Sequence, residues 1–272
     1  MPESRQHVAE LDPRLDILAQ CLSLHSTKTL PQLRNSLHQV VRLDGKIFEV
    51  IAGAPVEQYG ARFTFELPEH SKQKLAEHFS YDSHPWGLPD CIGVRINTSG
   101  NMQTKAYHML DCIDDRFVLP PCKPDQLVPV MAAQQQDTTE IYLRKATRGQ
   151  WGDFVEHCLQ PLDVHIDTGR IQPSPSEYGF CVSYKYSKDQ LSAITVYADF
   201  MTLPKEREIP ALWSQGLSEQ DRNYYEMCWA AVRSMGKVPG QGHHAMLAWS
   251  VEHTGAFHQG VSFRVPELNV VE

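Results

Sequence analysis

Short strands in which apolar and polar residues alternate recur along this chain, and they constrain its fold more than any other feature. The clearest example is 61–67 (ARFTFEL), where apolar residues alternate with Arg62, Thr64 and Glu66. Successive side chains of a strand point to opposite faces, so one face of this strand is apolar and the other is polar. In a half-buried sheet the polar face meets water. In a barrel wrapped by helices the polar face looks into the barrel instead.

Five hairpins of this kind are predicted, roughly 40 to 55 residues apart, with helical segments between them. The expected hairpins are 46–52 with 61–67, two strands within 91–110, 128–133 with 139–145, 179–187 with 191–200, and 244–253 with 258–265. The third pair is the least defined, because 130–136 also fits a helix.

Amphipathic segments between the hairpins predict the helices. They cover 12–24, 30–41, 69–79, 149–162 and 217–235. In the last of these, Ser218 is a good N-cap and Asp221 follows three residues later, as in a capping box. The order of helices and hairpins predicts an α/β (α+β) fold, namely a ten-stranded antiparallel barrel of repeated αββα units inside a layer of helices. A barrel of this size has a polar interior that a ligand or water must fill.

Length and composition narrow the classes of function. We expect the 272 residues to form one barrel domain, 1–272. The net charge of −8 argues against a general nucleic-acid binder. No apolar run approaches the ~20 residues of a membrane-spanning helix, and residues 1–10 carry no apolar signal segment. Seven cysteines without a CxxC pair predict reduced thiols and a cytoplasmic location.

The repeated αββα pattern, the strand 61–68 (ARFTFELP) and the Lys105-Ala106-Tyr107 strand together resemble the ABBA-type aromatic prenyltransferases. That superfamily includes the dimethylallyl-tryptophan synthases and the cyanobactin prenyltransferases. The resemblance covers most of the chain and rests on order and spacing. The short chain and the spacing from Glu49 to Arg62 are more similar to the cyanobactin or small bacterial branch.

The resemblance implies a function. A dimethylallyl or geranyl group would pass from its diphosphate to an aromatic or heteroatom acceptor, such as a Trp- or Tyr-like side chain of a small molecule or peptide, in natural-product biosynthesis. The expected partners are this donor and acceptor, without nucleic acid or membrane insertion, and the protein is expected to be a monomer or weak dimer. Two alternatives stay open: a non-catalytic barrel that binds a hydrophobic small ligand, and a different enzyme on an α+β scaffold.

Candidate site residues follow from the resemblance. The leaving diphosphate carries about three negative charges, which cations and hydroxyl donors must stabilise. The positions that match this task are Arg62, Lys105, Tyr107, Tyr142, Thr195, Tyr197 and Arg264. In the family, tyrosine rings shield the allylic cation, a contact worth about 2 kcal/mol per ring in a dry interior. The structural alternatives are solvent-facing strand charges for the cations and core packing for the tyrosines.

Two further residues are candidates for the acceptor side. Glu49 matches the family's acceptor-binding glutamate and would take the acceptor's proton, although Glu57 and Glu66 compete for that role. Trp249 is predicted to line the acceptor site, with packing against a helix as the alternative.

The chain also departs from the family pattern. The third unit of the indole prenyltransferases has an R-x-K-x-Y strand, whereas this chain has Glu140-Ile141-Tyr142. Fewer cations suggest that Mg²⁺ helps to neutralise the diphosphate, while no tightly bound cofactor is expected. The run 111–115 only resembles a reversed DDxxD motif and is expected to be a solvated loop. The histidines near the C-terminus fit no standard zinc spacing, so no metal site built by the protein itself is expected.

Overall fold

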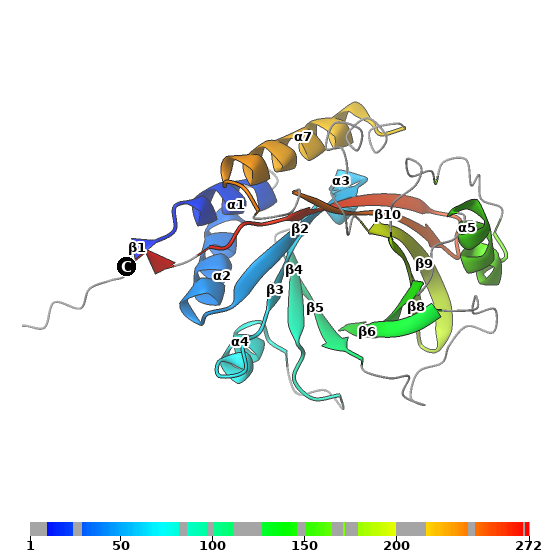
Figure 1. The fold of residues 1–272 in the computed structure, drawn as a ribbon, viewed down its shortest axis with the longest axis horizontal. Coiled ribbons are helices and arrows are strands. Elements are labelled where there is room, and N and C mark those ends of the chain that lie inside the picture. Colours follow the sequence, from blue (N-terminus) through cyan, green and yellow to red (C-terminus); the bar gives the residue numbers. More distant parts are fainter. Residues whose placement is uncertain are drawn as a thin grey trace, which may run out of the picture.

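A computed structural model gives the fold of this chain (Figure 1). It describes residues 10–23, 29–81, 86–96, 101–110, 127–145, 151–164, 171, 179–199, 216–238, 243–268 and 270–271. Ten antiparallel strands form a closed barrel, in the order β10-β11-β2-β3-β4-β5-β6-β7-β8-β9. The predicted fold class is therefore confirmed.

The elements have the following bounds. The strands are β1 (Glu10–Leu11), β2 (Lys46–Ala54), β3 (Ala61–Glu66), β4 (Cys91–Ile96), β5 (Met102–Met109), β6 (Leu127–Gln135), β7 (Thr138–Lys145), β8 (Gly179–Ser187), β9 (Gln190–Asp199), β10 (His244–Glu252), β11 (Phe257–Arg264) and β12 (Val270–Val271). The helices are α1 (Arg14–Leu22), α2 (Leu30–Arg42), α3 (Val56–Tyr59), α4 (Lys72–His78), α5 (Trp151–Leu159), the 3₁₀ turn η1 (Gln160–Leu162) and α7 (Glu219–Ser234).

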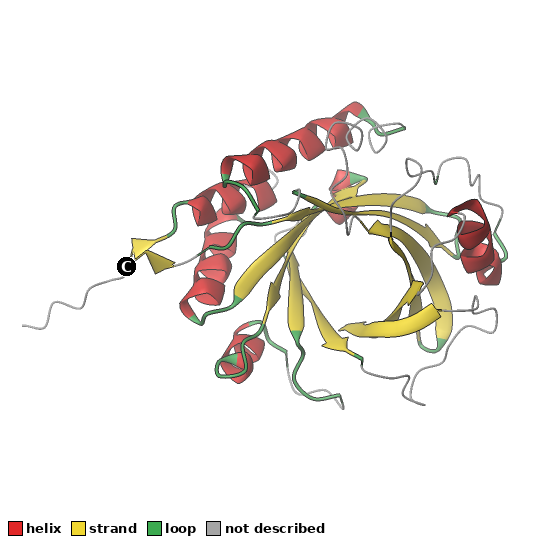
Figure 2. Ribbon diagram, in the orientation of Figure 1, coloured by secondary structure: helices red, strands yellow, loops and turns green. Residues whose placement is uncertain are grey.

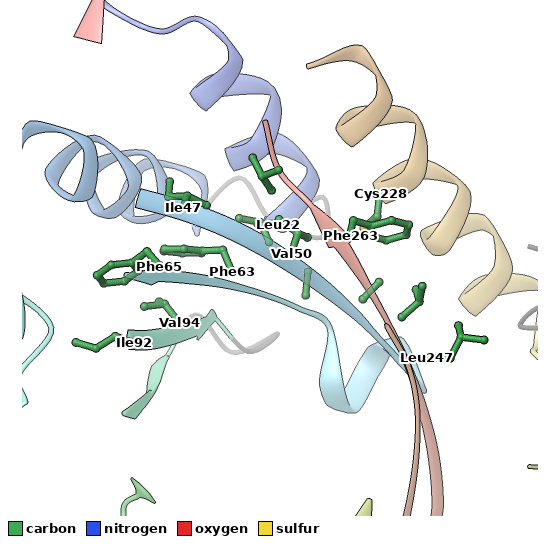
Figure 3. Close-up of a cluster of buried hydrophobic side chains, with 14 of the residues drawn as sticks. Leu22, Ile47, Val50, Phe63, Phe65, Ile92, Val94, Cys228, Leu247 and Phe263 are labelled. Carbon is green, nitrogen blue, oxygen red and sulfur yellow. The ribbon is translucent and has the colours of Figure 1, made fainter. Parts of the chain in front are cut away.

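The main hydrophobic core lies between the outer face of the barrel and the helices. Figure 2 shows the helices outside the ring of strands. Phe63 and Phe263 are fully buried on the outer face, and Figure 3 shows Leu22 of α1 and Cys228 of α7 on the helical side of the same cluster. The apolar residues of the alternating strands therefore face the helices, and the polar residues face the interior.

Some inner-face residues are less covered than their outward neighbours. Arg62 and Thr195 are half-buried, whereas their outward neighbours Phe63 and Val196 are fully buried. Small barrels of about eight strands fill their interior with side chains, but a ten-stranded barrel is wider. The interior of this barrel can therefore offer polar side chains to a ligand.

Most predicted elements are observed within a few residues of their expected bounds. The ambiguous third pair is a true hairpin, β6–β7, whose turn uses a positive φ of 50° at Gln136. Ser218 caps α7 and accepts a hydrogen bond from the backbone N–H of Asp221 at 3.1 Å, as predicted. The short helix α3 and the small β1–β12 sheet were not predicted. Within the described residues, no helix combines the length and hydropathy that crossing a bilayer requires.

Candidate active site

Four predicted site residues from three strands come together on the inner face of the barrel. The Arg62 guanidinium lies 5.8 Å from the centre of the Tyr107 ring. The Lys105 ammonium lies 5.5 Å from the Tyr107 ring centre and 5.3 Å from that of Tyr142. Because every second residue of a strand faces inward, β3, β5 and β7 place these side chains on the same side of the sheet.

Three tyrosines form a row across this face. The ring centroids of Tyr107 and Tyr142 are 6.1 Å apart, and those of Tyr142 and Tyr197 are 6.0 Å apart. Burial raises the pKa of Tyr107 to about 12 and also raises the pKa of Tyr142 and Tyr197. The three phenols therefore stay protonated at neutral pH and can donate hydrogen bonds. Tyr107 and Tyr142 also form a small apolar cluster inside the barrel with Ala133.

Lys105 is held by a carboxylate that the sequence reasoning did not assign to the site. Its ammonium forms a buried ion pair with Glu140 and donates a hydrogen bond to the Tyr142 hydroxyl at 2.8 Å. Ser183 also donates to Glu140, and its hydroxyl lies 3.1 Å from that of Tyr197. The Glu140-Ile141-Tyr142 strand was the available signal, because it carries a carboxylate at the position where the R-x-K-x-Y pattern expected from the resemblance has a lysine.

The pair is charged at neutral pH. Burial opposes ionisation of Glu140, but the Lys105 charge and the hydrogen bonds from Lys105 and Ser183 outweigh it and hold the pKa of Glu140 at about 2. Burial lowers the pKa of Lys105 to about 8, although Glu140 works in the opposite direction. Among the residues that the structure describes, Lys105 thus has acceptors for two of its three ammonium hydrogens, which leaves one for a ligand.

Arg62 has donor capacity that the described residues do not use. Its Nε is buried and has no hydrogen-bond partner in the described part of the chain. Gly93 on the neighbouring strand makes room for it. A Cβ at position 93 would lie 3.1 Å from Arg62 Cδ and 3.2 Å from Tyr107 Cε2. The glycine therefore lets the arginine and the tyrosine lie close to the backbone of β4.

Glu49, Thr195 and Arg264 also belong to the inner face. Glu49 accepts a hydrogen bond from Thr64 at 3.5 Å and lies opposite Arg264 in the β2–β11 register. Thr195 donates to Ser250 at 3.0 Å. Arg264 donates through Nη1 to the carbonyl oxygen of His244. The register therefore groups Arg264 with Glu49, at a distance along the sheet from Lys105.

The prediction for Trp249 is wrong. This side chain is only 3% exposed, and its ring centroid lies 5.6 Å from that of Trp151 on α5. It packs on the outer face under a helix, so it does not face an acceptor inside the barrel. Both faces of its strand are apolar near this position, and alternation alone could not distinguish them.

No cluster of three or more histidine, cysteine or acidic side chains that could hold a metal is found within the described ranges. His244 packs instead against the rings of Tyr225 and Trp229 under α7. The run 111–115 lies outside the described residues.

Comparison with known proteins supports the fold. No protein-family model matches the sequence, and no curated protein matches it. Among solved structures, the 5-dimethylallyltryptophan synthase from Streptomyces coelicolor is similar with a TM-score of 0.62 and 10% identity, over 92% of this chain and 95% of that chain. AnaPT from Neosartorya fischeri is similar with a TM-score of 0.61 and 10% identity, over 97% and 94%.

The prenyltransferase PriB, in a ternary complex with L-tryptophan and dimethylallyl thiolodiphosphate, is also similar. Its TM-score is 0.58 with 11% identity, over 95% of this chain and 98% of that chain. At such low identity the likeness shows a shared fold and no more. This chain therefore has the barrel fold of the ABBA-type aromatic prenyltransferases.

Proposed function

We propose that this protein transfers a prenyl group from an allylic diphosphate to an aromatic or heteroatom acceptor. One observation carries the proposal: Arg62 and Lys105 lie beside a row of three tyrosines on the inner face of a barrel with this fold. A simple carrier of a hydrophobic ligand needs no such combination of cations and phenols. PriB, whose fold is similar, binds L-tryptophan and dimethylallyl thiolodiphosphate, and this agrees with the proposed chemistry.

The first step breaks the bond between the allylic carbon and the diphosphate oxygen, and the electron pair leaves with the diphosphate. The developing negative charge needs donors that are already in place. Arg62 offers its Nε, which has no partner within the described ranges, and Lys105 offers the ammonium hydrogen that Glu140 and Tyr142 do not use. The protonated phenol of Tyr107 is a further donor.

The allylic cation then needs shielding from water. The faces of the three tyrosine rings attract a cation, and each such contact is worth about 2 kcal/mol when it is desolvated. The cluster of Tyr107, Ala133 and Tyr142, with Met131 packed against it, supplies apolar surface for the prenyl chain. A short dimethylallyl or geranyl chain is the donor that we propose.

The acceptor attacks the cation through its ring or heteroatom and must lose a proton. Glu49, on the inner face of β2, is the base that we propose for this proton. Mg²⁺ usually binds through one or two carboxylates together with substrate phosphates. A metal that arrives with the diphosphate would help to neutralise it, so we propose to test the reaction with Mg²⁺ and with EDTA.

Thermal-shift titration with thiolodiphosphate analogues of dimethylallyl and geranyl diphosphate tests donor binding. Ligand at ~100 Kd should stabilise the native state by ~2.7 kcal/mol, or several degrees in Tm. Donor and tryptophan, tyrosine or a tryptophan-containing cyclic dipeptide are then incubated and the product is identified by mass spectrometry. Glu49→Gln should keep donor binding and lose transfer. If neither analogue stabilises the protein, with or without Mg²⁺, the proposal fails.

A further inference from the structure

A second arginine lies directly beside Arg62 inside the barrel. Arg95 of β4 is the register partner of Arg62 of β3, and both side chains are on the inner face. Like charges directly opposite each other on neighbouring strands repel. In the part of the chain that the structure describes, neither guanidinium forms a salt bridge with a carboxylate. This contrasts with Lys105, which is paired with Glu140.

The electrostatics of the pair favour an anion. Burial and, next, the neighbouring charge of Arg62 together lower the pKa of Arg95 to about 10. Burial also opposes the charge of Arg62, but the neighbouring tyrosines and Glu49 outweigh it, so the pKa of Arg62 is raised. Both residues therefore remain charged at neutral pH, and for Arg95 the charge carries a cost in solvation and repulsion. A bound anion between them would remove both costs.

The surroundings of the pair also suit a phosphate group. Arg62 Nε is buried without a partner among the described residues, and Gly93 keeps the backbone of β4 clear between Arg62 and Tyr107. The Arg95 guanidinium lies 5.5 Å from the centre of the Tyr59 ring. The Tyr59 hydroxyl is in turn held by His258 at 2.7 Å and Glu252 at 3.3 Å. Arg95 thus lies over a ring that is held in place, and no hydrogen bond from its guanidinium to another described residue is found.

We infer that Arg62 and Arg95 together form the binding site for the diphosphate, and that Arg95 supplies charge that the Glu140 strand does not. Each guanidinium can bind phosphate oxygens in a bidentate manner, which a lysine cannot do. This inference rests on the proposed function for the identity of the donor. It adds a binding residue and shifts the site from Lys105, which is held by Glu140, toward β3 and β4.

The test measures the affinity for inorganic diphosphate by isothermal titration calorimetry, in buffer with EDTA so that no metal contributes. The variants are Arg95→Gln, Arg95→Lys and Arg62→Gln. Arg233→Gln is the matched control, because it removes the same charge from the exposed face of α7, where Arg233 lies over Trp229. The Tm of each variant without ligand shows whether it is folded. Inorganic phosphate is titrated in parallel.

Loss of one charge-assisted hydrogen bond should weaken diphosphate binding by about 10- to 100-fold in Arg95→Gln. Arg95→Lys should fall between this variant and the wild type, and the control should bind as the wild type does. Orthophosphate should bind more weakly than diphosphate, since it cannot bridge two guanidiniums as well. If Arg95→Gln does not fold, the comparison of Arg95→Lys with the wild type decides.

The inference is overturned if the Arg95 variants bind diphosphate as the wild type does, or if the wild type does not bind it. These results differ from failure of the proposed function. Suppose that diphosphate binding depends on Arg95, but the prenyl analogues do not bind and no prenylated product forms. The anion site would then be supported, and prenyl transfer would be refuted. If Arg95→Gln instead transfers the prenyl group with the rate and donor KM of the wild type, prenyl transfer would be supported and the role of Arg95 refuted.

Discussion

Removing either partner of the Lys105–Glu140 ion pair should destabilise the protein strongly. The two side chains are only 11% and 8% exposed, so the partner that remains would be a buried charge without its counterion. The pKa of Glu140 is about 2 instead of 4.5, which corresponds to about 3 kcal/mol at neutral pH. Loss of one member of a buried pair typically costs about 3 to 5 kcal/mol.

The assay is a double-mutant cycle in urea at pH 7. Glu140→Gln and Lys105→Met should each lower the free energy of unfolding by about 3 kcal/mol. The double variant should lose much less than the sum, because replacing both charges also removes both desolvation costs. Arg34→Gln is the control, since the Arg34–Asp16 pair is 42% and 48% exposed and should contribute about 0 to 1 kcal/mol.

Acid titration gives an independent check. A carboxylate whose folded pKa is lowered stabilises the native state above its ordinary pKa, and this stabilisation is lost as the pH falls toward the folded value. Between pH 4.5 and about 2 the wild type should therefore lose stability that Glu140→Gln does not lose. Single variants that cost less than about 1 kcal/mol and combine additively would refute the buried pair.

Three other substitutions test separate parts of the description. Gly93→Ala should raise the donor KM several-fold in steady-state assays, because the added methyl group displaces Arg62 and Tyr107; an unchanged KM would contradict their close packing against β4. Trp249→Ala should lower stability in urea by about 3 to 5 kcal/mol through lost packing against Trp151, with no change in acceptor KM, whereas a rise in that KM would restore the acceptor role. Ser218→Ala should cost about 1 kcal/mol in thermal unfolding through loss of the α7 cap, and Tm equal to that of the wild type would argue against the cap.

Alternation predicted the barrel because the two faces of most strands differ in chemistry. In β3 and β9 the outward residues are apolar and the inward ones polar. The sequence alone therefore indicated which residues of these strands face the helices and which face the barrel interior. The β6 strand was ambiguous because small and apolar residues such as Ala133 line part of its inner face as well. The prediction for Trp249 was wrong for the same reason.

The pairing of charged side chains inside the barrel could not be predicted from local sequence patterns. Lys105 and Glu140 lie 35 residues apart in the chain, on strands β5 and β7 that β6 separates, and they meet only in the folded sheet. Arg95 could be placed on a polar face, but its position beside Arg62 depends on the β3–β4 register. The sequence therefore predicted which strands carry the candidate site, and the closed sheet determined which charges share it.

Closure of the barrel also has a consequence for folding. The pairing of β11 with β2 joins Gln259 to Ala54, so the seam connects segments that are synthesised far apart in time. Until β11 is in place, β2 and β10 are open sheet edges that can pair with other chains. Contacts between such distant segments also slow folding. We therefore expect refolding at high protein concentration to favour aggregation, and variants that weaken the β11–β2 seam to aggregate before they lose the rest of the sheet.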